Sequence, residues 1–261
     1  MVKKCHDNYN KTLENIGIPI NIIIFTNMNY NIIKDEKTLL DFIEWLPKLK
    51  SNEQYYISLL ARRKYDKSGI IKTEKAVLSR ATATKDWLYQ KIKKMEIEMG
   101  SYTIGEYSIP EESMALYIHP NPRCMKKATF ETSKQLLVNI ENSNFLNPKT
   151  VAFNAIQNSI GRTIYMDFDF DVEKNDQNLE ELINKTYEIV GDSFTIIETR
   201  GGYHVLVNVS YLNSKYYKLW FNDMVIITIG GIKADRTKDL LLPVVGCVQG
   251  DFVPTFKIKY K

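Results

Sequence analysis

The chain contains 261 residues, of which 44% are hydrophobic and 25% charged, and its 35 basic and 31 acidic residues give a formal net charge of +4. This composition excludes a disordered or collagen-like chain and is typical of a globular protein. Cys5, Cys124 and Cys247 are too few and too far apart for a disulfide framework, so we expect a reducing cytoplasm. The longest apolar run, residues 18–25, contains a proline and an asparagine and is too short to span a bilayer, so we expect no membrane partner.

The first part of the chain reads as strands and helices with a basic segment among them. Hydrophobic periodicity predicts strands over residues 20–25, 54–61 and 115–119, and helices over residues 37–46, 84–99, 126–140 and 148–160. Basic residues clearly outnumber acidic ones from residue 62 to residue 94, which would suit phosphate binding or simply a solvated surface. The proline- and asparagine-rich stretch at 142–149 is the best candidate for a boundary.

The second part of the chain has a different rhythm. Strands are predicted over residues 163–170, 193–198 and 203–209, helices over 178–190 and 213–225, and a last apolar stretch over 240–245. This β-α-β-β-α-β order is the split arrangement of ferredoxin-like and RNA-recognition-like folds. We therefore predict an α+β fold for one unit of residues 1–261, with a basic α/β lobe over roughly 1–145 and the ferredoxin-like unit over 146–261.

The most informative local feature is the strand that contains Asp167, Asp169 and Asp171, which alternate with Met166, Phe168 and Phe170. Successive side chains of a strand point to opposite faces, so the three carboxylates share one face and the apolar residues face the core. Carboxylates this close raise each other's pKa unless a cation neutralises them. A hard divalent cation, Mg²⁺ or Mn²⁺, would do so and would bring phosphates with it; the alternative is a solvated strand edge.

The next strand begins after a tight turn and carries a histidine among apolar residues. The two glycines, Gly201 and Gly202, predict the turn, and the period of the strand places His204 on the same face as Leu206. A histidine there is either a core residue with satisfied hydrogen bonds or a member of the cleft that holds the aspartates. Arg200 and the amides of the two glycines would supply positive charge and hydrogen-bond donors for phosphate.

A third feature places acidic residues ahead of an apolar strand and a turn. Asp235 and Asp239 precede Pro243, and a glycine-bounded turn that carries Gln249 follows. Taken alone, this pattern is common.

In this order, the three features resemble the archaeo-eukaryotic primase superfamily, in particular the compact primase-polymerases of phages and mobile elements. Residues 166–169 are similar to the family's hydrophobic-Asp-hydrophobic-Asp strand, and residues 202–204 to its small-x-His hairpin. Residues 243–250 are similar to its Pro-x-x-Gly-Thr-x-Gln-Gly turn, except that Cys247 stands where Thr or Ser is expected. The resemblance covers roughly residues 115–256.

The resemblance implies a template-dependent nucleotidyltransferase, a DNA primase or DNA polymerase or both, that uses two Mg²⁺ or Mn²⁺ ions. Asp167, Asp169 and either Asp235 or Asp239 would hold the ions. The triphosphate of the incoming nucleotide would be bound by His204, Arg200, Gly201, Gly202 and Gln249.

The same resemblance implies a single-stranded DNA template, a primer and NTP or dNTP substrates in a bacterial, archaeal or phage-infected cell. A helicase or another replication or CRISPR-associated module, on this chain or another, would be a further partner. Nucleic-acid contacts are expected from Arg62, Arg63, Arg123, Lys126 and Lys127. The rival hypotheses are a metal-dependent nuclease or replication initiator and a catalytically silent nucleic-acid-binding module; a glycosyltransferase fits the order of elements less well.

Overall fold

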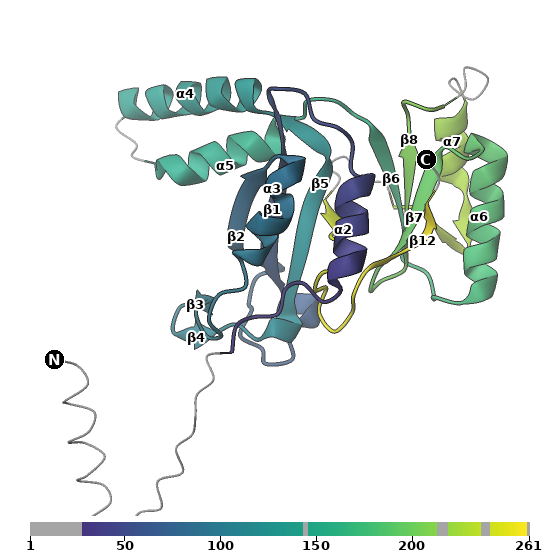
Figure 1. The fold of residues 1–261 in the computed structure, drawn as a ribbon, viewed down its shortest axis with the longest axis horizontal. Coiled ribbons are helices and arrows are strands. Elements are labelled where there is room, and N and C mark those ends of the chain that lie inside the picture. The colour runs from purple at the N-terminus through teal and green to yellow at the C-terminus, as the bar shows by residue number, and fades with distance from the viewer. Residues whose placement is uncertain (1–27, 143–145, 213–218, 236–240, 260–261) are drawn as a thin grey trace, which may run out of the picture.

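The computed structural model of the chain describes residues 28–142, 146–212, 219–235 and 241–259. Within these ranges the protein contains two four-stranded sheets, both antiparallel, two short hairpins and six α-helices, which confirms the α+β class (Figure 1). The predicted strand at 20–25, the first half of the predicted helix at 213–225 and the acid Asp239 lie outside the described residues.

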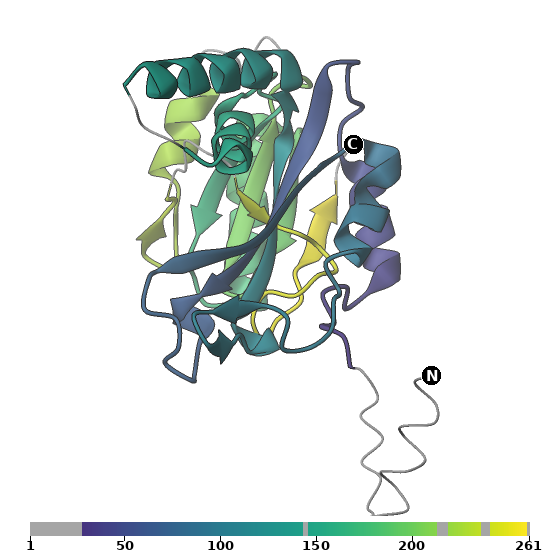
Figure 2. The ribbon, with the colours of Figure 1, turned by 90° about the vertical axis from the view of Figure 1, so that its left-hand side faces the viewer.

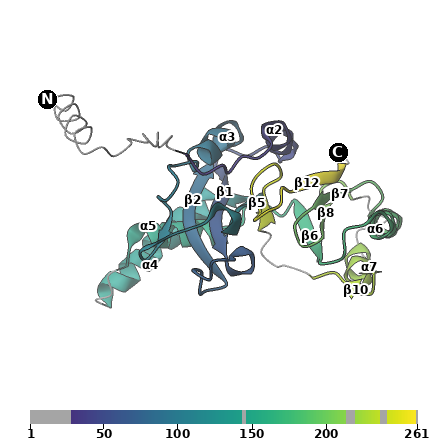
Figure 3. The same cartoon turned by 90° about the horizontal axis from the view of Figure 1, so that it is seen from below.

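The first sheet has the strand order β11-β5-β1-β2. Its strands are β11 (Leu242–Pro243), β5 (Met114–Cys124), β1 (Glu53–Arg62) and β2 (Lys75–Ala83). Helices α2 (Glu36–Trp45) and α3 (Lys85–Lys93) lie on one face, and α4 (Met125–Glu141) and α5 (Pro148–Asn158) lie on the other, as the view from below shows (Figure 3). The larger hydrophobic core fills the α2–α3 side, where alternate residues of β1 such as Tyr55, Ile57 and Leu59 are fully buried.

The second sheet has the strand order β12-β7-β8-β6. Its strands are β12 (Thr255–Lys259), β7 (Phe194–Glu198), β8 (Tyr203–Asn208) and β6 (Tyr165–Phe170). Helices α6 (Asp176–Val190) and α7 (Trp220–Ile226) cover one face and enclose a second core with Phe168, Phe170 and Val205. The opposite face contributes Tyr165, Ile197 and Leu206 to the core of the first sheet, so the two sheets share that core (Figures 1 and 3).

Three of the helices begin at residues whose side chains cap the first turn. Asp35 accepts a hydrogen bond from the amide of Thr38, and Asn175 does the same for the amide of Asn178. Asn147 accepts from the first amides of α5, where a proline takes the first helical position. These caps satisfy amides that have no partner inside the helix, which is why the helices start where they do.

Two short hairpins and two 3₁₀ turns lie outside the two main sheets in the described residues. The two-stranded hairpins are β3 (Thr103–Ile104) with β4 (Tyr107–Ser108) and β9 (Thr228–Ile229) with β10 (Ile232–Lys233), and the 3₁₀ turns are η1 (Arg63–Tyr65) and η2 (Glu111–Ser113). Figure 2 shows the first sheet crossing in front of the second, with the last strand, β12, beside α2. No helix in the described part of the chain is both long and apolar enough to cross a bilayer.

The structure corrects the predicted elements in four places. The strand expected to end at residue 119 continues to Cys124, through a bulge that contains Pro120 and Pro122. The helix expected to end at residue 99 ends at Lys93. The basic segment contains β2, which was not expected. The stretch at 240–245, expected to complete the second unit, supplies β11 to the first sheet instead, so the chain returns across the boundary suggested at residue 146.

Candidate functional site: an acidic face with a buried histidine

Strand β6 separates acidic from aromatic side chains as its alternation predicts. Phe168 and Phe170 are fully buried in the core beneath α6 and α7. Asp167 and Asp169 point to the other face, where their neighbours on β7 and β8 include Ile197 and Leu206 of the shared core. The two carboxylates therefore lie at the junction between the sheets, on the side away from the helices.

His204 lies between these two carboxylates. It is the cross-strand partner of Asp169 in the antiparallel β6–β8 pair. Its Nδ1 is 3.0 Å from Oδ1 and 2.9 Å from Oδ2 of Asp167, and its Nε2 is 3.5 Å from Oδ1 of Asp169. The sequence left open whether His204 is a core residue or a member of the acidic site, and the structure brings it into contact with both aspartates.

Burial and mutual charge shift the pKa values of this group strongly. Burial disfavours a charged imidazole, but the charge and hydrogen bond of Asp167, with smaller contributions from Asp169 and Asp171, raise the pKa of His204 to about 9. Burial raises the pKa of Asp169 to about 6; the positive His204 opposes this shift, while Asp167 and Asp171 add to it. The cluster therefore holds carboxylates that need a positive charge beside them, and in this structure His204 provides it.

A third acid joins the group from the segment after α7. The backbones of Asp169 and Asp235 exchange two hydrogen bonds, of 2.9 Å and 2.7 Å, in an isolated antiparallel bridge. Directly opposed residues of such a pair project to the same face, so Asp235 lies beside Asp169 on the edge of β6. Among the described residues no three His, Cys, Asp or Glu side chains already surround a common ion position. Asp239, the alternative third acid, lies outside those residues.

The hairpin that leads to His204 closes tightly over the end of β6. The amide of Thr199 donates to the carbonyl of Gly202 at 2.9 Å, which confirms the predicted turn. A Cβ atom on Gly202 would lie 2.0 Å from the carbonyl oxygen of Phe170, and one on Gly201 would lie 2.6 Å from a carboxylate oxygen of Asp171. Gly202 therefore requires glycine because the close atoms belong to the backbone, whereas at Gly201 the side chain of Asp171 could move aside.

The predicted phosphate ligands of this hairpin are held in place by other parts of the protein. Gln249 accepts the amide hydrogen of Arg200 at 2.9 Å and donates to the hydroxyl of Tyr65 at 3.3 Å. The guanidinium of Arg200 donates to Asp251 at 2.7 Å and lies over the ring of Tyr65. Gln249 is buried, so its side chain positions the turn, whereas about a third of the Arg200 side chain stays exposed. No other described residue accepts the amides of Gly201 and Gly202.

The third motif packs as a structural turn within the larger core, which contains Val244, Val245, Cys247 and Val248. Gly246 adopts a φ of +82°, and a Cβ there would lie 2.6 Å from the amide nitrogen of Leu39 in α2. The next residue, Cys247, is fully buried, and burial raises the pKa of its thiol. The missing hydroxyl at this position is therefore a substitution inside the core rather than at an exposed surface.

The basic residues predicted to contact nucleic acid fall into two separate groups. Arg62 and Arg63 lie at the start of η1, beside Lys64, whose charge lowers the pKa of Asp169. Lys126 and Lys127 are exposed in the first turn of α4, at the other end of β5, about 30 Å away along that strand.

The prediction for Arg123 needs correction. Its side chain is only 1% exposed, under α5, because β5 continues past the prolines and carries Arg123 into the sheet. It is therefore not available as a surface contact in this structure.

Two buried tyrosines, which contact Arg200 and Arg62, were not predicted from the sequence. Tyr65 is buried between Gln249 and Arg200, and Tyr117 accepts a hydrogen bond of 2.8 Å from Arg62. With 16 tyrosines in the chain, composition gave no means of selecting these two. Only the pairing of β5 with β1 and the return of the chain at 242–249 bring them beside Arg62, Arg200 and Gln249.

Comparison with known proteins gave no match: no family model, no curated protein and no solved structure matches this chain.

Proposed function

We propose that the acidic face, formed by Asp167, Asp169, Asp235 and His204, is the active site of a template-dependent nucleotidyltransferase. The observation that carries the proposal is the pair of carboxylates beside a buried imidazole on one strand pair, with a third acid bridged to the second carboxylate. Carboxylate oxygens are the ligands that Mg²⁺ and Mn²⁺ prefer, and a raised carboxyl pKa marks a place where a cation is favoured. The motif resemblance to primase-polymerases supports the same reaction.

The split ferredoxin-like unit belongs to this proposal. The supporting facts are the chain order β6-α6-β7-β8-α7, the adjacency of β6 and β8, and the bridge of Asp235 to the free edge of β6. In such a unit the segment around Asp235 takes the position of the last strand, and β12 is an addition on the edge of β7.

Each residue of the face has a distinct task in this proposal. Asp167, Asp169 and Asp235 hold the divalent ions, which activate the attacking 3′-hydroxyl and stabilise the leaving pyrophosphate when bound. His204 orients Asp167 through Nδ1 and neutralises part of the acidic charge. Arg200 and the amides of Gly201 and Gly202 lie at the end of β6 and are available to the phosphates of a nucleotide.

Positive charge for the nucleic-acid backbone is available beside the site. Arg63 and Lys64 are exposed on η1, and the exposed part of Arg200 lies over the ring of their neighbour Tyr65. Phosphate contacts of this kind lose affinity as salt concentration rises. We therefore assign the template or primer strand to the η1 side of the acidic face rather than to the distant Lys126 and Lys127.

The decisive test is primer synthesis and primer extension on circular single-stranded DNA, with NTPs or dNTPs and with Mn²⁺ or Mg²⁺. We expect incorporation by the wild-type chain, and its loss in Asp167→Asn and Asp169→Asn, which preserve side-chain shape. Asp86→Asn, at an exposed position of α3, is the matched control and should retain activity.

Three results would reject the proposal. The first is full activity in both active-site variants. The second is cleavage of labelled DNA without any nucleotide, which identifies the metal-dependent nuclease. The third is divalent-independent DNA binding with no incorporation under any of the four conditions, which identifies the silent binding module.

A further inference from the structure

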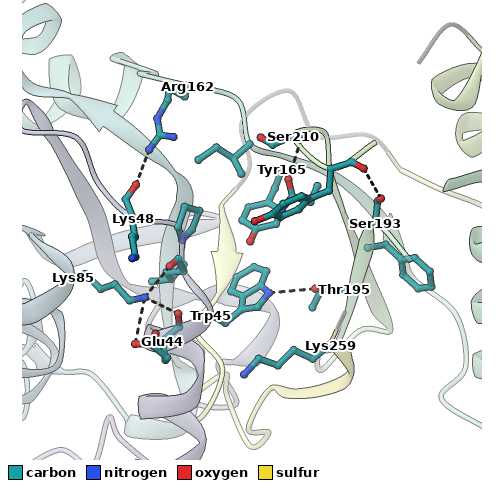
Figure 4. A pocket seen from close by; sticks show the side chains of 16 residues that line it. Glu44, Trp45, Lys48, Lys85, Arg162, Tyr165, Ser193, Thr195, Ser210 and Lys259 are labelled. Carbon is teal, nitrogen blue, oxygen red and sulfur yellow. Dashed lines mark hydrogen bonds and ion pairs between the residues drawn. The ribbon is translucent and has the colours of Figure 1, made fainter. Parts of the chain in front are cut away.

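A pocket of about 760 Å³ opens at the end of the junction between the sheets that lies away from the acidic face (Figure 4). It lies between the end of α2, the start of α3 and the Tyr165 end of β6. Tyr165 precedes Asp169 by four residues on the same strand and the same face, which is about 13 Å. The volume is in the range of small-molecule sites, and the pocket shares no lining residue with the acidic face.

The inner wall of the pocket is aromatic and rigidly held. The rings of Trp45 and Tyr165 stack with centroids 4.7 Å apart and an interplanar angle of 21°. The indole Nε1 of Trp45 donates to Thr195 Oγ1 at 3.2 Å, so both the plane and the direction of the ring are fixed (Figure 4). Tyr211, at the rim, is 65% exposed and offers a ring that is free to receive a planar ligand.

Four cationic side chains from separate segments line the same pocket, against a single acidic one, Glu44. They are Lys48, Lys85, Arg162 and Lys259. Lys85 is committed to the protein, because its ammonium donates to the carbonyls of Glu44 and Leu46 at the end of α2. Lys259 is held more loosely, by a hydrogen bond of 3.5 Å to the carbonyl of Asp41 and by its position over the ring of Phe256. Lys48, Lys259 and Arg162 are therefore the cations that a ligand can use.

The guanidinium of Arg162 is held in a defined position by hydrogen bonds from two of its three nitrogens. Its Nε and Nη2 donate to the two carboxylate oxygens of the buried Glu53, and Nη2 also donates to the carbonyl of Lys48. Its Nη1 has no partner among the described residues, and neither has the ammonium of Lys48. Fixed donors that surround an aromatic wall are what an anion with a planar ring requires.

We propose that this pocket binds a nucleoside phosphate, either free or at the end of a single strand, independently of the acidic face. The base stacks on the exposed ring of Tyr211 and lies against the edge of the aromatic wall, because Trp45 already stacks with both Tyr165 and Phe42. The phosphates meet Lys48, Lys259 and the free edge of Arg162. Base stacking tolerates any base, so the pocket selects for the nucleoside phosphate class rather than for sequence. The proposal does not depend on the nucleotidyltransferase activity proposed above.

The test is calorimetric binding in EDTA, using a chain that carries Asp167→Asn and Asp169→Asn so that the acidic face contributes no metal-dependent site. The probes are ATP, inorganic tripolyphosphate and a 5′-phosphorylated ten-residue oligothymidylate. We expect ATP or the oligonucleotide to bind, and Lys48→Ala with Lys259→Ala to weaken binding about ten-fold. Tighter ATP identifies a free nucleotide as the ligand, and a tighter oligonucleotide identifies a strand end.

The matched control is Lys91→Ala with Lys94→Ala, which removes the same charge from two exposed positions outside the pocket, the last turn and the C-cap of α3. This control pair should leave the binding of all three probes unchanged. Tyr211→Ala should weaken the binding of ATP but not the binding of tripolyphosphate. Absence of binding by both nucleotide probes would overturn the proposal. An equal loss in the control pair would overturn it as well, and so would equal binding of ATP and tripolyphosphate that Tyr211→Ala leaves unchanged.

Discussion

The contact between His204 and Asp167 predicts a pH-dependent stability that one substitution should remove. In chelator, without divalent ions, the imidazolium is the cation that lies between the two carboxylates. Replacing it by glutamine in His204→Gln retains a polar side chain of similar reach but removes the titrating charge. The free energy of unfolding of this variant should therefore respond less to pH than that of the wild-type chain.

The magnitude follows from the pKa of His204, which is about 9 in the folded protein against an ordinary value of 6.5. A histidine whose folded pKa is raised stabilises the protein fully below pH 6.5 and loses that contribution as pH rises through 9. The difference corresponds to about 3 kcal/mol at most. Asp169 acts in a separate pH range. Because its folded pKa is raised from 3.8 to about 6, its contribution to stability is lost as pH rises from 3.8 to about 6.

The assay is urea unfolding between pH 5 and pH 10 in EDTA, with wild type, His204→Gln and the Asp167→Asn, Asp169→Asn double variant. At pH 6.5 the free energy of unfolding of the wild-type chain should exceed that of His204→Gln. The two curves of unfolding free energy against pH should converge above pH 9. The double variant should lose the decline in stability between pH 6.5 and pH 9. Without the carboxylates burial lowers the pKa of His204, so stability should instead rise with pH below 6.5. Parallel curves for wild type and His204→Gln would refute the reasoning.

Two further predictions concern packing rather than titration. Gly202→Ala places a Cβ 2.0 Å from a backbone oxygen of β6 and should lower the free energy of unfolding by about 3 kcal/mol or more. The control is Gly69→Ala, at a φ of +72° with open space around it, which should lower the free energy of unfolding by about 1 kcal/mol. Equal losses for the two variants in urea unfolding would contradict the clash. Arg162→Met leaves the buried Glu53 without its ion-pair partner and should lower the free energy of unfolding by about 3 kcal/mol. Lys185→Met, in an exposed ion pair of α6, should lower it by about 1 kcal/mol or less. Thermal and urea unfolding measure both losses, and similar values would mean that the Glu53–Arg162 pair is exposed to solvent.

Local patterns predict the parts of the site that lie within one strand or one turn. The period of β6 separates Asp167 and Asp169 from Phe168 and Phe170 because strand alternation needs no knowledge of the partner strand. The paired glycines predict the hairpin for the same reason. The contact of His204 with the aspartates is harder to predict, because it depends on the register between β6 and β8. Strand alternation alone indicates only which face of its own strand His204 occupies.

Pairings between distant segments are not contained in such patterns. The apolar stretch before Gly246 suits either sheet, and only the three-dimensional packing against Ile118 and Tyr117 assigns β11 to the first one. Arg123 follows two prolines that usually end a strand, yet the bulge in β5 lets the strand continue and buries the residue. The pocket beside Trp45 draws on six segments of chain, so no local motif marks it.

The two carboxylates of the acidic face differ in their neighbours and in their exposure to solvent. Asp167 is opposite Leu206, which belongs to the shared core, and its side chain is 2% exposed. Asp169 is opposite His204 near the end of the strand, and its side chain is 25% exposed. A ligand arriving from solvent meets Asp169 first, whereas Asp167 is accessible only beside an imidazole that it already binds. Asp167 therefore fixes the geometry of the cluster. Under the function proposed above, Asp169 is the carboxylate that would exchange a proton for a metal ion.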